Sequence, residues 1–310
     1  MLVVKPPFSC YDSGRKAVFL MDLCSPVEMR ALLSRHGFHF SKAKGQNFLT
    51  QHWVVEQLAE GAGVGPDCGV LEIGPGMGPL TVELCQRAGA VVAVEVDTSL
   101  KPVLAETTAD CTGLTILWAD ALKLDLRKTV DEQLPNLRHL ACANLPYYIT
   151  SPVLSALLEA NCFESVTVMV QKEVAQRICA KPGTKDYGAF TVFCRYYADA
   201  ELLFEVPASC FLPQPKVTSA VVKLTVRGTP PAHVENEACF FRTMRAAFAQ
   251  RRKTLLNALT SGFPELGKPR LEDILLQAGI SPTVRGETLD ISEFCRISNL
   301  IASEGCSRHV

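Results

Sequence analysis

The sequence predicts an α/β protein: a mostly parallel sheet with helices on both faces, followed by an all-helical region. From residue 69 to residue 170, short apolar runs alternate with helix-like stretches, which is typical of parallel sheets. Residues 228–233 include Pro230 and Pro231 and have the composition of a linker. Beyond this linker, residues 235–305 show only helical patterning.

Apolar runs bounded by turn residues indicate the strands. We expect strands at residues 69–73, 91–96, 114–118, 139–143, 166–170, 200–206 and 218–226. Only a Pro-rich loop separates the last two, which favours an antiparallel, hairpin-like edge. We expect helices at residues 27–36, 52–61, 80–88, 151–160, 172–179, 189–196, 237–259, 271–278 and 292–303. Residues 40–50 are interpreted as a loop and residues 125–133 as a polar segment.

Composition indicates a globular protein, with 48% hydrophobic and 20% charged residues. No apolar run reaches the ~20 residues of a transmembrane helix, and the first residues lack the apolar centre of a signal peptide. We therefore expect a cytoplasmic protein with no membrane contact. The 13 cysteines include no Cys-x-x-Cys pair, so we interpret them as reduced thiols and expect no metal site.

Basic residues are concentrated in three segments although the net charge is only −1. Residues 29–55, 206–234 and 238–264 hold four, three and five Lys or Arg, and none of the 32 acidic residues. If these segments converge in space, they form an anion-binding face. The alternative is three ordinary solvated stretches on different faces, and charge alone does not decide between them.

Three successive expected strands end in residues that suit a nucleotide-type cofactor. Gly74 and Gly76 belong to a Gly-x-Gly-x-Gly turn, which lets a ligand approach the backbone but also fits a simple tight turn. Glu95 lies 21 residues beyond Gly74, at a position where an acid accepts hydrogen bonds from ribose hydroxyls. Asp120 is placed to accept the amino group of a bound adenine, or alternatively to cap a helix. Because parallel strands end at one edge of a sheet, these residues predict one site.

The sequence Asn144-Leu145-Pro146-Tyr147 follows the fourth expected strand and suits methylation of an exocyclic adenine amine. The lone pair of such an amine is delocalised, so acceptors are needed to hold its hydrogens and aim the lone pair. The Asn144 side-chain oxygen and a backbone carbonyl can do so, Pro146 stiffens the turn, and the Tyr147 ring can stack on the base. The alternative is a plain strand-to-helix turn with an aromatic packed behind it.

These residues belong to longer stretches that resemble the small-subunit ribosomal RNA adenine dimethyltransferase family of the bacterial type. The stretches are residues 45–49, 72–76, 94–97, 120–121, 144–147, 171–177, 187–188, 211–217 and 247–254. The resemblance covers about residues 22–303. It implies a seven-strand, Rossmann-like fold of the S-adenosylmethionine-dependent methyltransferases with a small all-helical C-terminal domain. It also implies transfer of methyl groups from S-adenosylmethionine to N6 of two adjacent adenines near the RNA 3′ end.

The resemblance also implies roles for individual residues. The implied cofactor contacts are Asn47, Leu49, Gly74, Glu95, Asp120 and Asn144. Phe211 resembles a second aromatic that sandwiches the target adenine opposite Tyr147, with a place in the core as the alternative. For RNA binding, the basic segments suggest Lys216, Arg251, Arg252 and Lys253. The last three are consecutive, so on a helix they would point in different directions, and one of them could instead bind within the protein.

The expected organisation has three parts: a disordered extension at residues 1–20, a catalytic domain at 21–233 and a helical RNA-binding domain at 234–310. The expected partner is the RNA of an immature small ribosomal subunit, with a role in its maturation, and the protein is expected to be a monomer. One alternative is the large-subunit adenine methyltransferase of the macrolide-resistance type, against which Tyr187-Gly188 and the basic helical tail argue. The other is a non-catalytic assembly factor, which intact glycine-turn and Asn144–Tyr147 sequences disfavour.

Overall fold

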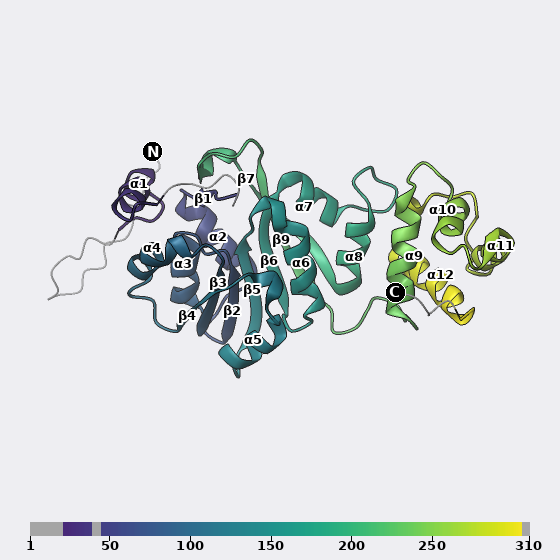
Figure 1. The fold of residues 1–310 in the computed structure, drawn as a ribbon, viewed down its shortest axis with the longest axis horizontal. Coiled ribbons are helices and arrows are strands. Elements are labelled where there is room, and N and C mark those ends of the chain that lie inside the picture. The colour runs from purple at the N-terminus through teal and green to yellow at the C-terminus, as the bar shows by residue number, and fades with distance from the viewer. Residues whose placement is uncertain (1–20, 39–44, 306–310) are drawn as a thin grey trace, which may run out of the picture.

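In the computed structural model, residues 21–38 and 45–305 are described, and they form an α/β unit followed by a group of helices (Figure 1). The extension expected at residues 1–20, as well as Lys42 and Lys44, lies outside the described residues. Each described helix is too short or too polar to cross a lipid bilayer.

A seven-stranded sheet forms the centre of the α/β unit, with the strand order β4-β3-β2-β5-β6-β9-β7. Its strands are β2 (Cys68–Ile73), β3 (Ala90–Glu95), β4 (Leu114–Trp118), β5 (Arg138–Asn144), β6 (Ser165–Gln171), β7 (Ala198–Val206) and β9 (Ser219–Val226). The five strands from β2 to β6 pair in parallel, and β9 pairs antiparallel with both β6 and β7. All seven expected strands and the antiparallel edge are therefore confirmed.

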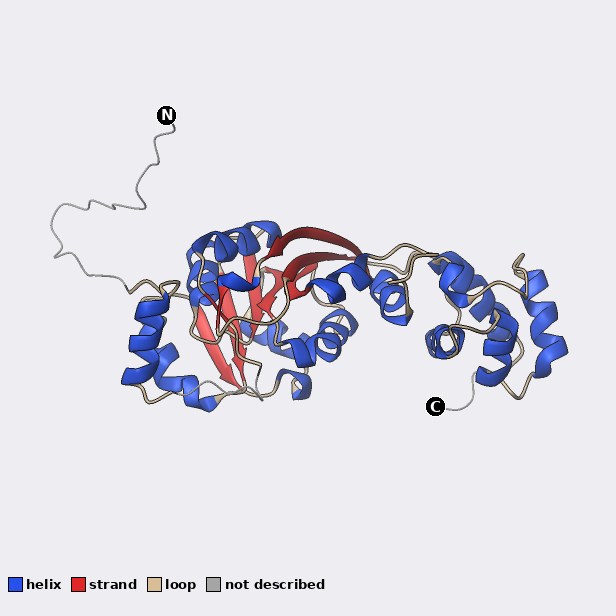
Figure 2. Cartoon of the chain, turned by 90° about the horizontal axis from the view of Figure 1, so that it is seen from above, coloured by secondary structure: helices blue, strands red, loops and turns tan. Residues whose placement is uncertain are grey.

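Helices cover both faces of this sheet (Figure 2). One face packs against α5 (Leu126–Gln133), α6 (Thr150–Glu159), α7 (Lys172–Cys179) and α8 (Ala189–Tyr197). The other face packs against α2 (His52–Ala62) and α3 (Pro79–Arg87). Beyond them, α1 (Pro26–Arg35) packs with α4 (Lys101–Thr107). The polar segment expected at 125–133 is thus the helix α5, whose Leu126 and Val130 face the core.

A second, two-stranded sheet closes one side of the α/β unit. It pairs β1 (Phe48–Leu49) with β8 (Phe211–Leu212) in antiparallel fashion. We expected residues 40–50 to form a loop, because two residues are too few to produce a strand pattern. This small sheet joins parts of the chain that are more than 160 residues apart.

The C-terminal region is helical, as expected, but its first helix is shorter than predicted. Instead of one helix over residues 237–259 there are two, α9 (Glu237–Ala249) and α10 (Leu255–Gly262). The break occurs because Gln250 leaves the helical conformation and the Thr254 side chain caps α10 by accepting from the Asn257 backbone N–H. The remaining helices are α11 (Gly267–Gln277) and α12 (Ile291–Ser303).

The core of this helical region includes residues from before the linker. Tyr187, Val192 and Tyr196 are buried together with residues of α9, α10 and α12. The Tyr187 hydroxyl donates to the Leu289 carbonyl oxygen over 2.7 Å. Both views place these helices at the opposite end of the molecule from α1 (Figures 1 and 2). The loop before α8 and α8 itself therefore connect the sheet to the C-terminal helices.

Candidate active site

A pocket lies at the carboxyl ends of the four parallel strands β2, β3, β4 and β5. It is lined by ten of the eleven residues for which the sequence suggested a cofactor or catalytic role. These are Asn47, Leu49, Gly74, Gly76, Glu95, Asp120, Asn144, Leu145, Pro146 and Tyr147. The topology explains this convergence, because the parallel strands all end at the same edge of the sheet.

The turn after β2 forms one wall of the pocket. Gly74 and Gly76 have φ angles of 72° and 61°, in the left-handed region that favours glycine. A Cβ atom added to Gly76 would also lie only 2.9 Å from the Phe48 ring. Gly74 has more space, since the nearest atom to an added Cβ is 3.8 Å away, on Pro146. The turn thus needs glycine for its own conformation and, at Gly76, for its close packing against Phe48.

Glu95 ends β3 with its side chain held in position at the pocket. One carboxylate oxygen accepts the Gly76 backbone N–H over 3.3 Å, and the other accepts the Asp97 N–H over 2.8 Å. The residue is 6% exposed, and burial raises the pKa of its carboxyl despite these hydrogen bonds. The two backbone donors use about half of the acceptor positions of the carboxylate. The remaining positions suit ribose hydroxyls, so the buried carboxylate fits the cofactor expected here.

Asp120 lies two residues beyond the end of β4. Its carboxylate accepts the Leu122 backbone N–H over 3.0 Å and so caps a short 3₁₀ turn. The capping interpretation is therefore seen in the structure, and Asp120 lines the pocket as well. One oxygen thus holds the side chain in place. The other lies 3.9 Å from the exposed Lys123 ammonium, beyond hydrogen-bonding distance, and can still accept an amino group in the pocket.

Asn144 ends β5 and is oriented by a residue far away in the sequence. Its Nδ2 donates to the backbone carbonyl oxygen of Asn47 over 3.2 Å. Because a carbonyl only accepts, this bond fixes which side of the amide is nitrogen. The Oδ1 atom has no hydrogen-bond partner among residues 21–38 and 45–305. The side chain therefore presents an acceptor at the pocket, as the proposed chemistry requires.

Tyr147 follows Asn144 across the turn that contains Pro146. Its hydroxyl forms a 2.7 Å hydrogen bond with the Ser219 hydroxyl at the start of β9. Partial burial raises the pKa of the Tyr147 phenol, although the bond to Ser219 acts in the opposite direction. With its hydroxyl held in this way, the half-buried ring lines the pocket as a fixed surface.

Phe211 is the one of the eleven predicted cofactor and catalytic residues that does not line the pocket. It is 4% exposed and packs in the core with Leu49, Val55 and Leu58. Its strand pairs with β1, opposite Leu49, so its backbone is adjacent to the pocket wall. The structure thus places Phe211 in the alternative position, the core, and stacking on a base would require its ring to leave that position.

Within residues 21–38 and 45–305, the basic side chains of the three segments do not form one local patch, contrary to one of the two expectations. Arg30 and Arg35 belong to α1, which lies at the opposite end of the molecule from α9 and α10 (Figure 1). Acids and carbonyls from other parts of the chain also bind several of the basic side chains. The pairs are Arg35 with Glu106, Lys223 with the Gly61 carbonyl, Arg227 with Asp199, Arg242 with Glu265, and Arg251 with Glu287.

The predicted RNA-binding residues differ in their surroundings. Arg251 donates to the carbonyl oxygens of Lys185 and Tyr187 and pairs with Glu287 over 3.1 Å, so it is bound within the protein. Arg252 and Lys253 are exposed, and no side-chain partner is found for them in the described part of the chain. All three lie in the turn between α9 and α10, although we had expected them to lie on a helix. Lys216 is exposed in the loop between β8 and β9.

Two features of the site were given no role by the sequence reasoning. Glu72 lines the pocket, is 1% exposed and accepts a 2.7 Å hydrogen bond from the Thr81 hydroxyl. Burial raises the pKa of its carboxyl to about 8. The position of Glu72 inside the apolar run of β2 was the feature of the sequence that could have indicated a role for it. Gln46 also lines the pocket and donates to Asp97 over 2.8 Å. No local pattern in the sequence indicates that long-range contact.

The fold and the site define the class of protein: an S-adenosylmethionine-dependent methyltransferase. Comparisons with known proteins narrow this class. The model of the ribosomal RNA adenine dimethylase family matches residues 37–303. The chain therefore belongs to the ribosomal RNA adenine dimethylase family.

Curated relatives agree over most of the chain. The protein named ribosomal RNA small subunit methyltransferase A from Geobacillus kaustophilus is 45% identical over 285 residues, which cover 91% of this chain and 97% of the relative. A protein of the same name from Lactococcus lactis is 44% identical over 277 residues, or 89% of this chain and 94% of the relative.

Solved structures also share the fold. The 23S rRNA methyltransferase ErmE is 27% identical with a TM-score of 0.63, and the match covers 83% of this chain and 100% of that one. A dimethyladenosine transferase from Plasmodium falciparum has a TM-score of 0.72 at 24% identity, covering 83% of this chain and 98% of that one. Because its sequence identity is only 24%, this second match supports the fold alone.

Proposed function

We propose that this protein transfers methyl groups from S-adenosylmethionine to N6 of adenine in small-subunit ribosomal RNA. The observation that carries the proposal is the orientation of Asn144, whose amide nitrogen is bound by the Asn47 carbonyl while its oxygen remains available at the pocket. Membership of the adenine dimethylase family and the names of the curated relatives support the same substrate.

The residues of the pocket fit the cofactor. Glu95 would bind the ribose hydroxyls, Asp120 the adenine amino group, and the Gly74–Gly76 turn would pass close to the ligand. When bound, S-adenosylmethionine would supply an electrophilic methyl group. Asn47 and Leu49 complete the wall on the side of β1.

The chain itself prepares the target amine. Asn144 Oδ1 accepts one N6 hydrogen, and a carbonyl of the Leu145–Pro146 turn accepts the other, which directs the nitrogen lone pair at the methyl donor. Tyr147 supports the extruded base by stacking. As the N–C bond forms and the sulfonium S–C bond breaks, the positive charge passes from sulfur, left as a neutral thioether, to the amine. The amine then releases a proton to solvent, so no strong general base is needed beforehand.

The finer parts of the proposal concern the substrate and its setting. We infer that the targets are two adjacent adenines near the RNA 3′ end and that an immature small subunit is the physiological partner. We also infer that the enzyme acts as a monomer in the cytoplasm, where such subunits are assembled. Lys216, Arg252 and Lys253 are the proposed phosphate contacts, while Arg251 holds the turn between α9 and α10 against the loop before α8.

The test is to incubate the protein with unmodified small subunits and methyl-labelled cofactor, and then to map the labelled nucleotides. Label at N6 of adjacent adenines near the small-subunit RNA 3′ end is expected, with fully methylated subunits as the control that takes up none. Label only in large-subunit RNA would favour the macrolide-resistance type of enzyme. Binding to the subunit without any label would favour an assembly factor.

A further inference from the structure

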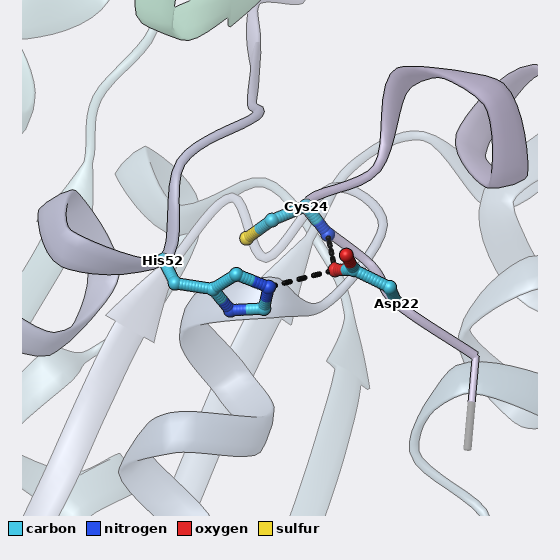
Figure 3. A group of neighbouring side chains, drawn as sticks. All are labelled: Asp22, Cys24 and His52. Carbon is cyan, nitrogen blue, oxygen red and sulfur yellow. Dashed lines mark hydrogen bonds and ion pairs between the residues drawn. The ribbon is translucent and has the colours of Figure 1, made fainter. Parts of the chain in front are cut away.

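A cluster of three side chains with metal-binding groups lies away from the methyltransferase pocket, which they do not line. Asp22 and Cys24 belong to the segment before α1, and His52 is the first residue of α2 (Figure 3). One carboxylate oxygen, the Cys24 sulfur and one imidazole nitrogen all lie within 4.8 Å of one another. Two elements distant in the sequence therefore bring three different donor atoms to one place.

The cluster is held together by hydrogen bonds that also orient it. Asp22 Oδ1 lies 2.8 Å from His52 Nε2 and accepts the Cys24 backbone N–H over 2.8 Å. The side chains of Asp22 and His52 are 42% and 64% exposed, whereas Cys24 is 5% exposed. The sulfur is thus at the floor of the cluster, and the two other ligands form its solvent side. An ion can reach the site from solvent.

The donor set suits zinc or an ion of similar chemistry. Zinc binds Cys sulfur, His nitrogen and carboxylate oxygen at about 2.0–2.3 Å in a tetrahedral arrangement. Tetrahedral ligands at these bond lengths lie about 3.4 Å apart. Three donor atoms already within 4.8 Å of one another need only small side-chain movements to reach this spacing. With three protein ligands, the fourth position would hold a water molecule.

The surroundings of Cys24 favour a dication. Three carboxylates, those of Asp22, Glu56 and Glu83, lie near enough to the buried Cys24 side chain to act on it electrostatically. Their negative charge favours a divalent cation at this position. No role in methyl transfer accounts for this arrangement.

We propose that Asp22, Cys24 and His52 bind one Zn²⁺ or a chemically similar divalent ion, which links the segment before α1 to the start of α2. This site departs from our expectation that the chain has no metal site. The ion would replace the Asp22–His52 hydrogen bond by two metal–ligand bonds and engage the Cys24 sulfur. Since α1 packs against Phe48 and Met77, beside the glycine turn, the ion would stabilise the outer support of the pocket wall.

The site can be tested with reduced, metal-free, full-length protein and Co²⁺ as a spectroscopic probe for Zn²⁺. Titration is expected to produce thiolate-to-cobalt charge-transfer absorption that saturates at one equivalent and is abolished by Zn²⁺. His52→Gln changes an exposed side chain and is expected to weaken Co²⁺ binding at least about tenfold, since even outer-shell changes cost 10- to 100-fold. Cys24→Ser is expected to lose the charge-transfer band.

Matched controls separate this cluster from the other thiols and imidazoles. Cys162→Ser changes a half-buried thiol and His233→Gln an exposed imidazole, both outside the cluster, and both should bind Co²⁺ as the wild type does. In thermal unfolding, Zn²⁺ should raise the melting temperature of the wild type and of both controls but not of His52→Gln. Absence of a saturable band in the wild type overturns the proposal. Binding by His52→Gln and Cys24→Ser within tenfold of the wild type overturns it as well.

Discussion

Removing the oriented acceptor at Asn144 is the most direct test of the proposed chemistry. Asn144→Ala deletes both the Oδ1 atom at the pocket and the 3.2 Å hydrogen bond from Nδ2 to the Asn47 carbonyl. The side chain is only partly buried, so little apolar packing is lost and the fold should persist. The variant therefore isolates the contribution of one preorganised polar group to the transfer step.

The expected loss follows from how such groups act. A preorganised polar contact at a reacting centre typically contributes a factor of ~10²–10³ in rate, or about 2.7–4 kcal/mol. Asn144→Asp should be less impaired, because it keeps an acceptor. Its carboxylate, however, has no hydrogen to donate to the Asn47 carbonyl and would lose its fixed orientation. A neutral hydrogen bond of this kind is worth about 0.5–1.5 kcal/mol, so Asp should lose at least about two- to tenfold.

The assay is single-turnover methylation of unmodified small subunits, with cofactor affinity measured separately by calorimetry. Asn257→Ala is the matched control, because Asn257 is an exposed residue of α10 outside the pocket. Circular dichroism and the melting temperature report whether each variant is folded. If folded Asn144→Ala keeps more than half of the wild-type rate, the oriented acceptor is not needed and the proposed role of Asn144 is wrong.

Three further predictions follow from the site. Glu95→Ala should weaken cofactor binding by about 1.5–3 kcal/mol in calorimetry with little effect on single-turnover rate at saturating cofactor, because the ribose contacts do not change during transfer. Burial raises the pKa of Glu72 from 4.5 to about 8, so its carboxyl is neutral in the folded protein. The wild-type free energy of unfolding should therefore fall as the pH rises from about 4.5 to about 8. Denaturant titrations of Glu72→Gln should lack this contribution. Arg252→Glu with Lys253→Glu should weaken small-subunit binding and flatten its salt dependence by close to one unit of slope per lost contact, whereas unchanged binding would refute RNA contact by this turn.

Much of the cofactor side of the site could be predicted from the sequence, for a simple physical reason. Each strand of a parallel sheet buried on both faces is a short apolar run, so the strand ends can be located in the chain. Parallel strands bring those ends to one edge of the sheet. The residues at or just beyond the ends of β2, β3, β4 and β5 therefore meet in one pocket, as expected for Gly74, Glu95, Asp120 and Asn144.

The contacts that hold the site in position were not predictable in this way. The bond between Asn47 and Asn144 joins residues 97 positions apart, and neither residue carries a local pattern that indicates it. The pairing of β1 with β8 likewise involves two residues on each side. By contrast, the break between α9 and α10 had a local signal that we did not use. Thr254 is an N-cap residue three positions before Asn257, whose backbone N–H its side chain accepts.

The position of Phe211 shows where local patterns and packing disagree, and magnitudes decide between them. Stacking a base on an aromatic side chain is worth about 1–3 kcal/mol. Removing a buried Phe ring from a core costs about 3–5 kcal/mol, because the ring leaves a cavity behind. Phe211 at 4% exposure is such a ring, opposite Leu49 in the strand pair that forms the pocket wall. Stacking alone therefore does not offset its departure from the core, and we propose that Tyr147, rather than Phe211, is the aromatic that supports the target base.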